Sequence, residues 1–194
     1  MAIRLEKGQR ISLAKEAGTS LAQVFLGLGW GRRTKKGLFG TKEVDVDLDA
    51  SCLMFEANGQ LVDQVWFRQL RSKCQTVQHS GDDRSGGGQA DDDNERIQVD
   101  LKNLPANVQQ LVFTVNSFLA DSFKGIPNAF CRLFDVDGKK EIARFNLSLD
   151  GGEHTGLVMA KLSRQSGEWE MQAVGAYGEG RTFDKLMPVI AQHL

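Results

Sequence analysis

The chain has 194 residues, of which 41% are hydrophobic and 25% are charged, so it holds enough apolar material to build a globular core. Its formal net charge of −1 at pH 7 argues against a protein that binds nucleic acid through an overall positive field, and no nucleic-acid partner is expected. We predict a single domain over residues 1–194.

The N-terminus and the cysteines favour a cytoplasmic protein. Residues 1–8 contain no apolar signal core, and no apolar run in the chain reaches the length of a membrane span. The three cysteines, Cys52, Cys74 and Cys131, form no CxxC pair, so neither a disulfide framework nor a zinc knuckle is expected. Free thiols are typical of a reducing cytoplasm.

Most of the predicted elements are strands. Apolar and polar residues alternate with the period of two that a half-buried strand requires. Turn-forming pairs, such as Asn58 with Gly59 and Asp137 with Gly138, join successive runs into hairpins. In chain order, strands are predicted over residues 22–28, 51–55, 61–67, 109–117, 129–134, 141–149, 157–163 and 168–174.

Helical signals are sparse. Phe183, Leu186 and Ile190 recur at helical spacing, which predicts a short C-terminal helix that Pro188 starts or kinks. One helical turn is predicted within residues 115–128. The sequence therefore predicts an all-β fold, an antiparallel two-sheet β-sandwich with short helical pieces.

Two segments do not have a strand pattern, and they carry opposite charge. Residues 29–42 are rich in glycine and basic side chains and are predicted to form a flexible loop. Residues 79–94 form a second loop, rich in glycine, serine and aspartate. A loop of that length in a compact domain is usually functional or disordered. Opposed charge blocks within a near-neutral chain indicate local binding surfaces.

Three aspartates alternate with apolar residues at the start of the strand predicted near residue 51. If this segment is extended, Asp45, Asp47 and Asp49 lie on one face of it. Like charges in a row repel one another, and aspartate is a poor strand former, so a cation is expected at this face. A solvated edge strand is the alternative. An EF-hand is excluded because Ala50 stands where its loop requires glycine.

The acidic loop offers a second group of oxygen ligands. Ca²⁺ takes about six to eight oxygen ligands in flexible geometry, and glycines let backbone carbonyls turn toward an ion. His79 is the only nitrogen or sulfur ligand nearby, so zinc and copper are not expected. A disordered acidic loop is the alternative. The candidate ligands here are Asp82, Asp83, Asp93, Asn94 and Glu95.

Catalytic signals are weak, and the chain is not expected to be an enzyme. His79, His154 and His193 have no evident serine or cysteine partner in the sequence, and no Gly-x-Ser-x-Gly motif occurs. Clustered aspartates can hold two metal ions that hydrolyse phosphodiesters, so a metal-dependent phosphodiesterase is the alternative function. A scaffold with a solvated acidic loop is a third reading.

Several short motifs occur in an order that is typical of one protein family. The motifs are Leu5-Glu-Lys-Gly8, Ile11-Ser-Leu13, Gly27-Leu-Gly-Trp30, Asp47-Leu-Asp-Ala-Ser51, Val65-Trp-Phe-Arg68, His79-Ser-Gly-Asp82, Ile97-Gln-Val-Asp-Leu101 and Phe145-Asn-Leu-Ser148. On them the chain resembles the tellurium-resistance (TerD) family of bacterial stress proteins, over almost its whole length. It looks like the TerZ-like branch, which has a longer loop after the Gly-Leu-Gly-Trp motif.

The resemblance implies a β-sandwich that binds two Ca²⁺ ions, has no known catalytic activity and acts in resistance to tellurite and other stress. It also implies that the partners are other proteins of a stress-response assembly. Two departures concern the ligands. Gly31 stands where many relatives have aspartate, and the family's Gly-Asp-Asp-Glu is replaced by Asp93-Asn-Glu95 after extra acids at Asp91 and Asp92.

We therefore expect a Ca²⁺ cleft between residues 45–49 and residues 82–95, in a non-catalytic binding or sensing module. The acidic loop has almost no apolar residues with which to offset the entropy of ordering its backbone. We expect this loop to be mobile without metal and ordered with Ca²⁺.

Overall fold

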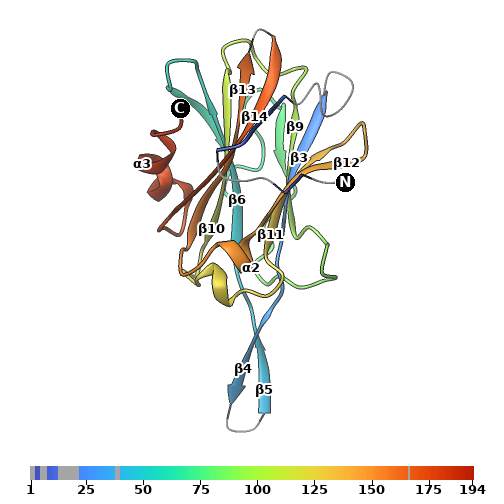
Figure 1. Ribbon diagram of the computed structural model, residues 1–194, viewed down its shortest axis with the longest axis vertical. Helices are drawn as coiled ribbons and strands as arrows, with labels where there is room; N and C mark the ends of the chain where they lie inside the picture. The colour runs from blue at the N-terminus through green and yellow to red at the C-terminus, as the bar shows by residue number, and fades with distance from the viewer. Residues whose placement is uncertain (1–2, 5–7, 13–21, 38–39, 166) are drawn as a thin grey trace.

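Two stacked β-sheets form the body of the protein. The computed structural model describes residues 3–4, 8–12, 22–37, 40–165 and 167–194. Within these residues each sheet has six strands, and a separate two-stranded hairpin projects from one end of the sandwich (Figure 1). The predicted all-β sandwich is confirmed. No helix among the described residues has the length and apolar character that a membrane crossing requires.

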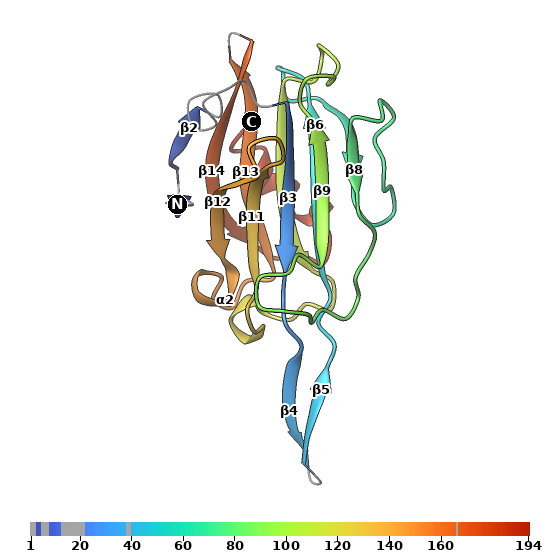
Figure 2. The same cartoon turned by 90° about the vertical axis from the view of Figure 1, so that its right-hand side faces the viewer.

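The first sheet, which faces the viewer in Figure 2, contains the strands on either side of the acidic loop. Among its described pairs only β1 with β12 is parallel, and the others are antiparallel. Its order is β1 (Ile3–Arg4), β12 (Lys140–Asn146), β11 (Phe130–Asp135), β3 (Gln23–Gly29), β9 (Glu95–Asp100) and β8 (Val77–His79).

The second sheet is antiparallel at every described pair and contains the aspartate-rich segment. Both β6 and β10 are buried along their whole length, as expected of central strands that are covered on two faces. The order is β2 (Arg10–Ser12), β14 (Glu168–Gly178), β13 (Gly156–Gln165), β10 (Gln110–Ser117), β6 (Leu48–Phe55) and β7 (Leu61–Val65).

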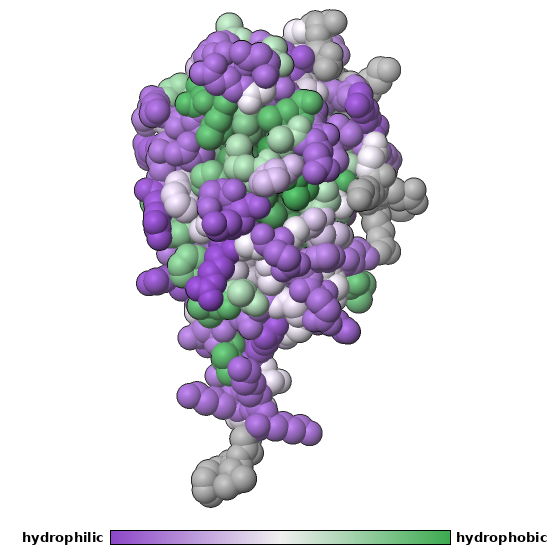
Figure 3. Space-filling model, turned by 90° about the vertical axis from the view of Figure 1, so that its left-hand side faces the viewer, coloured by the Kyte–Doolittle hydropathy of each residue, from purple (hydrophilic) through white to green (hydrophobic). Residues whose placement is uncertain are grey.

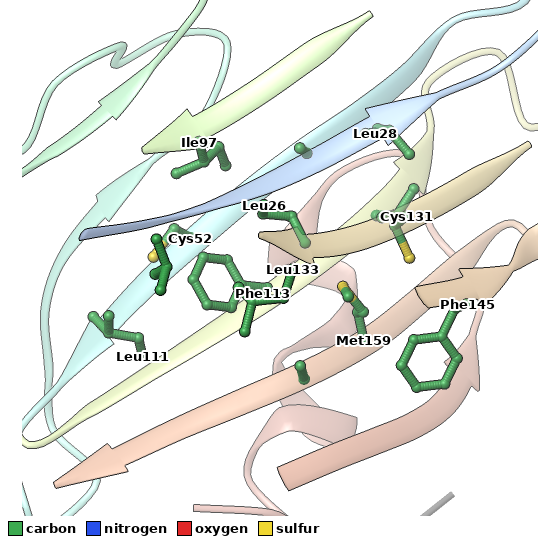
Figure 4. Close-up of a cluster of buried hydrophobic side chains, with 14 of the residues drawn as sticks. Leu26, Leu28, Cys52, Ile97, Leu111, Phe113, Cys131, Leu133, Phe145 and Met159 are labelled. Carbon is green, nitrogen blue, oxygen red and sulfur yellow. The ribbon is translucent and has the colours of Figure 1, made fainter. Parts of the chain in front are cut away.

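The core lies between the sheets and follows the period of two. Leu26 and Ile97 from the first sheet meet Cys52 and Phe113 from the second, and all four are fully buried (Figure 4). Because side chains alternate along a strand, the other residues of β6 lie on the outer face of the second sheet. Asp49 is one of them, and this alternation places its carboxylate outside the apolar core.

The C-terminal segment covers part of that outer face. The predicted helix is split into η2 (Phe183–Leu186) and α3 (Met187–Ile190), with Pro188 in the first turn of α3. Leu186 and Ile190 pack in a second apolar cluster with residues of β6, β10 and β14. Figure 3 looks onto this side, where apolar surface gathers in the upper half of the view within a polar surround.

Residues 29–42 were predicted as a loop, and this prediction is wrong. They contribute to a hairpin of β4 (Arg33–Gly37) and β5 (Gly40–Val44) that projects beyond the sandwich (Figures 1 and 2). Its strands carry no apolar alternation because neither face packs on a core. Lys35 lies opposite Lys42, a pairing of like charges that weakens a ladder.

Smaller differences occur at the ends of elements. The strand predicted over residues 141–149 ends at Asn146, whose side chain accepts a hydrogen bond from Leu149 N and caps the short helix α2 (Leu147–Asp150). The helical turn predicted within residues 115–128 is confirmed as η1 (Phe123–Gly125).

All three cysteines are free, and we expect Cys74 to react first with an alkylating agent. Cys52 and Cys131 are fully buried, and burial raises the pKa of both thiols. Partial burial of Cys74 opposes its ionisation, but hydrogen bonds with Ser72 and Thr76 outweigh it and lower the pKa of that thiol. Timed iodoacetamide labelling with peptide mass spectrometry checks the order. Earlier labelling of either buried cysteine would contradict it.

Candidate metal site

Three carboxylates meet near the start of β6 in the second sheet. Asp49 belongs to β6, Asp47 directly precedes it, and Asp82 comes from the loop that follows β8. One carboxylate oxygen from each lies within 4.8 Å of the others. Within the part of the chain that the structure describes, this is the one group of three acidic, histidine or cysteine side chains close enough to hold an ion.

The two inner carboxylates are buried and short of partners. Asp47 is 6% exposed and Asp49 is 3% exposed. Neither Oδ1 of Asp47 nor Oδ2 of Asp49 accepts a hydrogen bond in the structure. A buried carboxylate without a partner is costly when it is charged. Either a proton on the carboxyl group or a cation bound to the carboxylate can remove this cost, and either one would account for the two oxygens without hydrogen-bond partners.

The electrostatics of the cluster favour protonation when no cation is present. Burial, together with the charges of Glu95 and Asp47, raises the pKa of Asp49 to about 8. Burial, together with the charges of Asp82 and Glu95, raises the pKa of Asp47 to about 6. The one basic side chain lining the cavity, Arg84, lies 3.7 Å from Asp82, but its exposed guanidinium is screened by water.

The space between the carboxylates suits one small ion. The cavity has a volume of about 20 Å³, close to that of a single water-sized guest. Phe67 and Phe118 line it beside the three aspartates. Their rings limit the access of water and thereby strengthen the interaction between the carboxylates and a bound cation.

Strand β10 adds a neutral oxygen atom beside the cluster that the charge pattern of the sequence did not indicate. Asn116 is paired with Asp49 across the two strands, and Thr114 is paired with Ser51. Asn116 donates from Nδ2 to the carbonyl of Gly180, but its Oδ1 has no partner, nor does Oγ1 of Thr114. The available signal was that Thr114 and Asn116 stand at alternate positions among apolar residues of a buried strand.

Glu95 lies behind the cluster and joins the loop to the sheet. Its Oε2 accepts a hydrogen bond from Ala50 N at 2.9 Å, and its Oε1 accepts one from Asp83 N at 3.2 Å. His79 Nδ1 accepts a hydrogen bond from Gly81 N, so its Nε2, 3.3 Å from Glu95 Oε2, carries the proton. Burial raises the pKa of Glu95, although its contacts with His79 oppose this.

Asp83 and Asn94 hold the acidic loop in shape. Asp83 Oδ1 accepts hydrogen bonds from the backbone of Ser85 and Gly86, and its Oδ2 accepts one from Asn94 Nδ2. Burial opposes ionisation of Asp83, but these bonds outweigh it and lower the pKa of its carboxyl. Asn94 Oδ1 accepts from Trp30 N. Both side chains therefore use their oxygens within the protein.

Asp93 and Asp45 lie elsewhere. Asp93 crosses to the outer face of the first sheet, where both its oxygens accept hydrogen bonds from Arg132 at 2.8 Å and Arg96 adds a third. The side chain of Asp45 is 68% exposed and lies 3.9 Å from Arg32. The alternation that would align Asp45 with Asp49 does not apply, because β6 begins only at Leu48.

The Gly-Leu-Gly-Trp motif has a structural explanation at this site. A Cβ at Gly27 would collide with the Asp93 carboxylate, and a Cβ at Gly29 would collide with the backbone of Asp92, so both glycines make room for the returning loop. Trp30 donates from Nε1 to the carbonyl of Val46 at 2.7 Å and thereby fixes the chain just before Asp47.

Gly31, which stands where the family resemblance led us to expect an acid, lies against Pro127. Gly31 donates from its backbone N to the carbonyl of Pro127 at 2.7 Å, and a side chain there would start against Pro127.

Comparisons with known proteins agree with this architecture. A model of the TerD domain matches residues 1–188. The chain is 46% identical to the tellurium resistance protein TerZ of Serratia marcescens over 188 residues, which cover 95% of this chain and 94% of the relative. It is 38% identical to the stress response protein SCP2 of Bacillus subtilis (strain 168), and that match covers the whole of both chains.

The fold is also found in solved structures. A homologue of the telluride resistance protein (TerD), SCO6318 from Streptomyces coelicolor A3(2), matches with a TM-score of 0.70 at 20% identity. The match covers 82% of this chain and 92% of that one. The family resemblance noted in the sequence is thereby confirmed, and this chain belongs to the TerD family of tellurium-resistance and stress-response proteins.

Proposed function

We propose that the protein is a Ca²⁺-binding, non-catalytic module of a stress-response assembly, and that Asp47, Asp49 and Asp82 hold the ion. The observation that carries this proposal is the pair of buried carboxylate oxygens on Asp47 and Asp49 that lack partners and face Asp82. An all-oxygen set of carboxylates suits a hard cation. Nitrogen is not offered, because His79 is turned toward Glu95.

Ca²⁺ suits the set better than Mg²⁺. Mg²⁺ demands near-ideal octahedral geometry, whereas Ca²⁺ accepts irregular sets with neutral oxygens among them. The amide oxygen of Asn116 lies on the strand beside Asp49 and is a neutral candidate. The ion would join Asp82 of the loop to Asp47 and Asp49 at the start of β6, which couples the loop to the sandwich. A second Ca²⁺ remains a prediction of the family resemblance.

The alternative function is a metal-dependent phosphodiesterase. That chemistry usually needs two ions about 3.5–4 Å apart. A cavity of about 20 Å³ has room for one ion. Incubation with bis(p-nitrophenyl) phosphate and Mn²⁺ separates the two functions, because turnover that Asp49→Asn removes would favour the enzyme.

Calorimetric titration of EDTA-treated protein with Ca²⁺ tests the proposed site. We expect Asp47→Asn, Asp49→Asn and Asp82→Asn each to weaken binding at least about tenfold, because each removes one anionic ligand and the number of charged ligands tunes Ca²⁺ affinity. Unchanged titrations in all three variants would show that the carboxylates are not ligands.

The control is Asp137→Asn, in the exposed turn between β11 and β12. Asp63, which looks like a surface residue in the sequence, is unsuitable because it is buried and accepts hydrogen bonds from Gln64, Gln69 and Lys73. We expect Asp137→Asn to bind Ca²⁺ like the unaltered protein.

A further inference from the structure

A row of four aromatic side chains runs from the C-terminal segment to the metal site. Trp66 is in edge contact with Phe183 at 5.1 Å and with Phe67 at 4.8 Å, measured between ring centroids. Phe67 is in turn in edge contact with Phe118 at 5.6 Å. None of the four is fully buried. Partly exposed aromatic surface that is gathered in one place indicates a binding surface more often than a packing defect.

Two of these rings, those of Trp66 and Phe118, border a groove on the outer side of the second sheet. The groove has a volume of about 750 Å³ and is lined by Trp66 and Phe118, together with the segment from Glu179 to Lys185. Pockets that bind small molecules usually have volumes of about 300–1,000 Å³ and combine aromatic walls with a few polar groups. This groove has the dimensions and the walls of such a site.

The charges of the groove favour an anion. Arg68 and Arg181 both line it, and neither has an ion-pair partner among the described residues. The guanidinium of Arg68 lies 5.4 Å from the ring centroid of Trp66 and 5.3 Å from that of Phe67. The guanidinium of Arg68 therefore packs on the aromatic row, and its N–H groups remain available to a ligand.

The acidic side chains of the groove are already engaged. Glu179 accepts a hydrogen bond from Thr155 and contacts His154, both at 2.9 Å. Asp184 accepts a hydrogen bond from Thr182 and lies 3.8 Å from Lys185. Three cationic side chains, Arg68, Arg181 and Lys185, line the groove against the two carboxylates of Glu179 and Asp184, so its net charge is positive by one.

We propose that this groove binds a small aromatic anion, a molecule with a planar ring and a phosphate or carboxylate group. The ring stacks on Trp66 and Phe118, which supply apolar surface at little entropic cost. The anionic group accepts hydrogen bonds from Arg68 and Arg181, since a guanidinium fork matches the oxygens of phosphate and carboxylate. This site is separate from the proposed metal site and does not require a bound cation.

The two sites are nevertheless neighbours. Phe118 lines both the groove and the cavity of Asp47, Asp49 and Asp82. A cation among those carboxylates would reduce their repulsion of an anion in the groove. We expect Ca²⁺ to tighten anion binding, and this additional effect rests on the proposed function.

Calorimetry with two probes, AMP and 1-naphthyl phosphate, tests the groove in EDTA and again in Ca²⁺. Both probes carry a ring and a phosphate, and we expect saturable binding of at least one of them in at least one buffer. Adenosine, which lacks the charge, and inorganic phosphate, which lacks the ring, should each bind at least about tenfold more weakly.

Variants assign the binding to the groove. Arg68→Gln and Arg181→Gln should each weaken probe binding about tenfold, because a charge-assisted hydrogen bond is lost. Arg71→Gln, an exposed arginine outside the groove, is the matched control and should bind like the unaltered protein. Both groove arginines are exposed, so we expect their replacement to leave the fold intact. Melting temperatures equal to that of the unaltered protein check this.

Two results would overturn the proposal. One is the absence of saturable binding of both probes in both buffers. The other is binding that the double variant Arg68→Gln/Arg181→Gln leaves unchanged. If probe binding passes these tests but does not respond to Ca²⁺, the groove stands and the proposed metal site loses support.

Discussion

Asp49→Asn should make the protein more stable in EDTA and should remove the stabilisation that Ca²⁺ gives to the unaltered protein. The two effects have opposite signs because the buried carboxylate lowers the free energy of unfolding when no cation is present, whereas it binds the ion when Ca²⁺ is present. Its folded-state pKa of about 8 implies that burying it costs on the order of 4 kcal/mol at neutral pH. Asparagine has a similar shape and no charge to desolvate.

Urea denaturation in EDTA and in Ca²⁺ measures both effects, with Asp137→Asn as the control that changes neither. For the unaltered protein, Ca²⁺ at about 100 times its Kd should add roughly 2.7 kcal/mol for one site. Loss of stability of Asp49→Asn in EDTA would identify Asp49 as a structural acceptor instead of a ligand. Coincident curves of the unaltered protein in the two buffers would remove the Ca²⁺ site.

In EDTA, the free energy of unfolding should fall as the pH rises from about 4 to about 8. The pKa of Asp49 is raised from 3.8 to about 8 and that of Asp47 to about 6. Between the unfolded and folded values, the native state binds more protons than the unfolded state, so raising the pH favours unfolding. This direction is opposite to that of a carboxylate in a salt bridge.

Urea denaturation in EDTA at a series of pH values measures this trend. Asp49→Asn should flatten the decline above about pH 7, where Asp47 has completed most of its titration. Stability that stays constant or rises between pH 5 and pH 8 would show that the two carboxyls are solvated in the native state.

The fold could be predicted largely because burial imposes a period on the sequence. β6 and β10 carry regular apolar residues on their inner faces, and the turns between strands contain glycine or asparagine. The β4–β5 hairpin could not be predicted in this way, because its strands face water on both sides and carry lysines and threonines without alternation.

The site could be predicted only in part, because ligand type can be read from a sequence and side-chain direction cannot. Asp47, Asp49 and Asp82 come together as the charge pattern suggested. Asp93 has the same chemistry, but it pairs with Arg132, far away in the sequence, across the first sheet. Only the path of the folded loop decides that pairing.

The acidic loop also has more internal structure than its composition suggested. Apolar residues are scarce in it, but hydrogen bonds accepted by Asp83 and Glu95, and one that Asn94 donates to the carbonyl of Gly87, hold it to itself and to β6. Backbone bonds add to these, including Gly87 N to the carbonyl of Trp30. Hydrogen bonds of polar side chains can therefore order a loop that contains few apolar residues.

The β4–β5 hairpin has a practical consequence for engineering this chain. It connects β3 of the first sheet to β6 of the second, and both of those strands are anchored by long antiparallel ladders. Exposed loop tips between anchored elements tolerate insertion and cleavage well. A fluorescent reporter could be grafted at the end of the hairpin, or new termini opened there by circular permutation, with both sheets left intact.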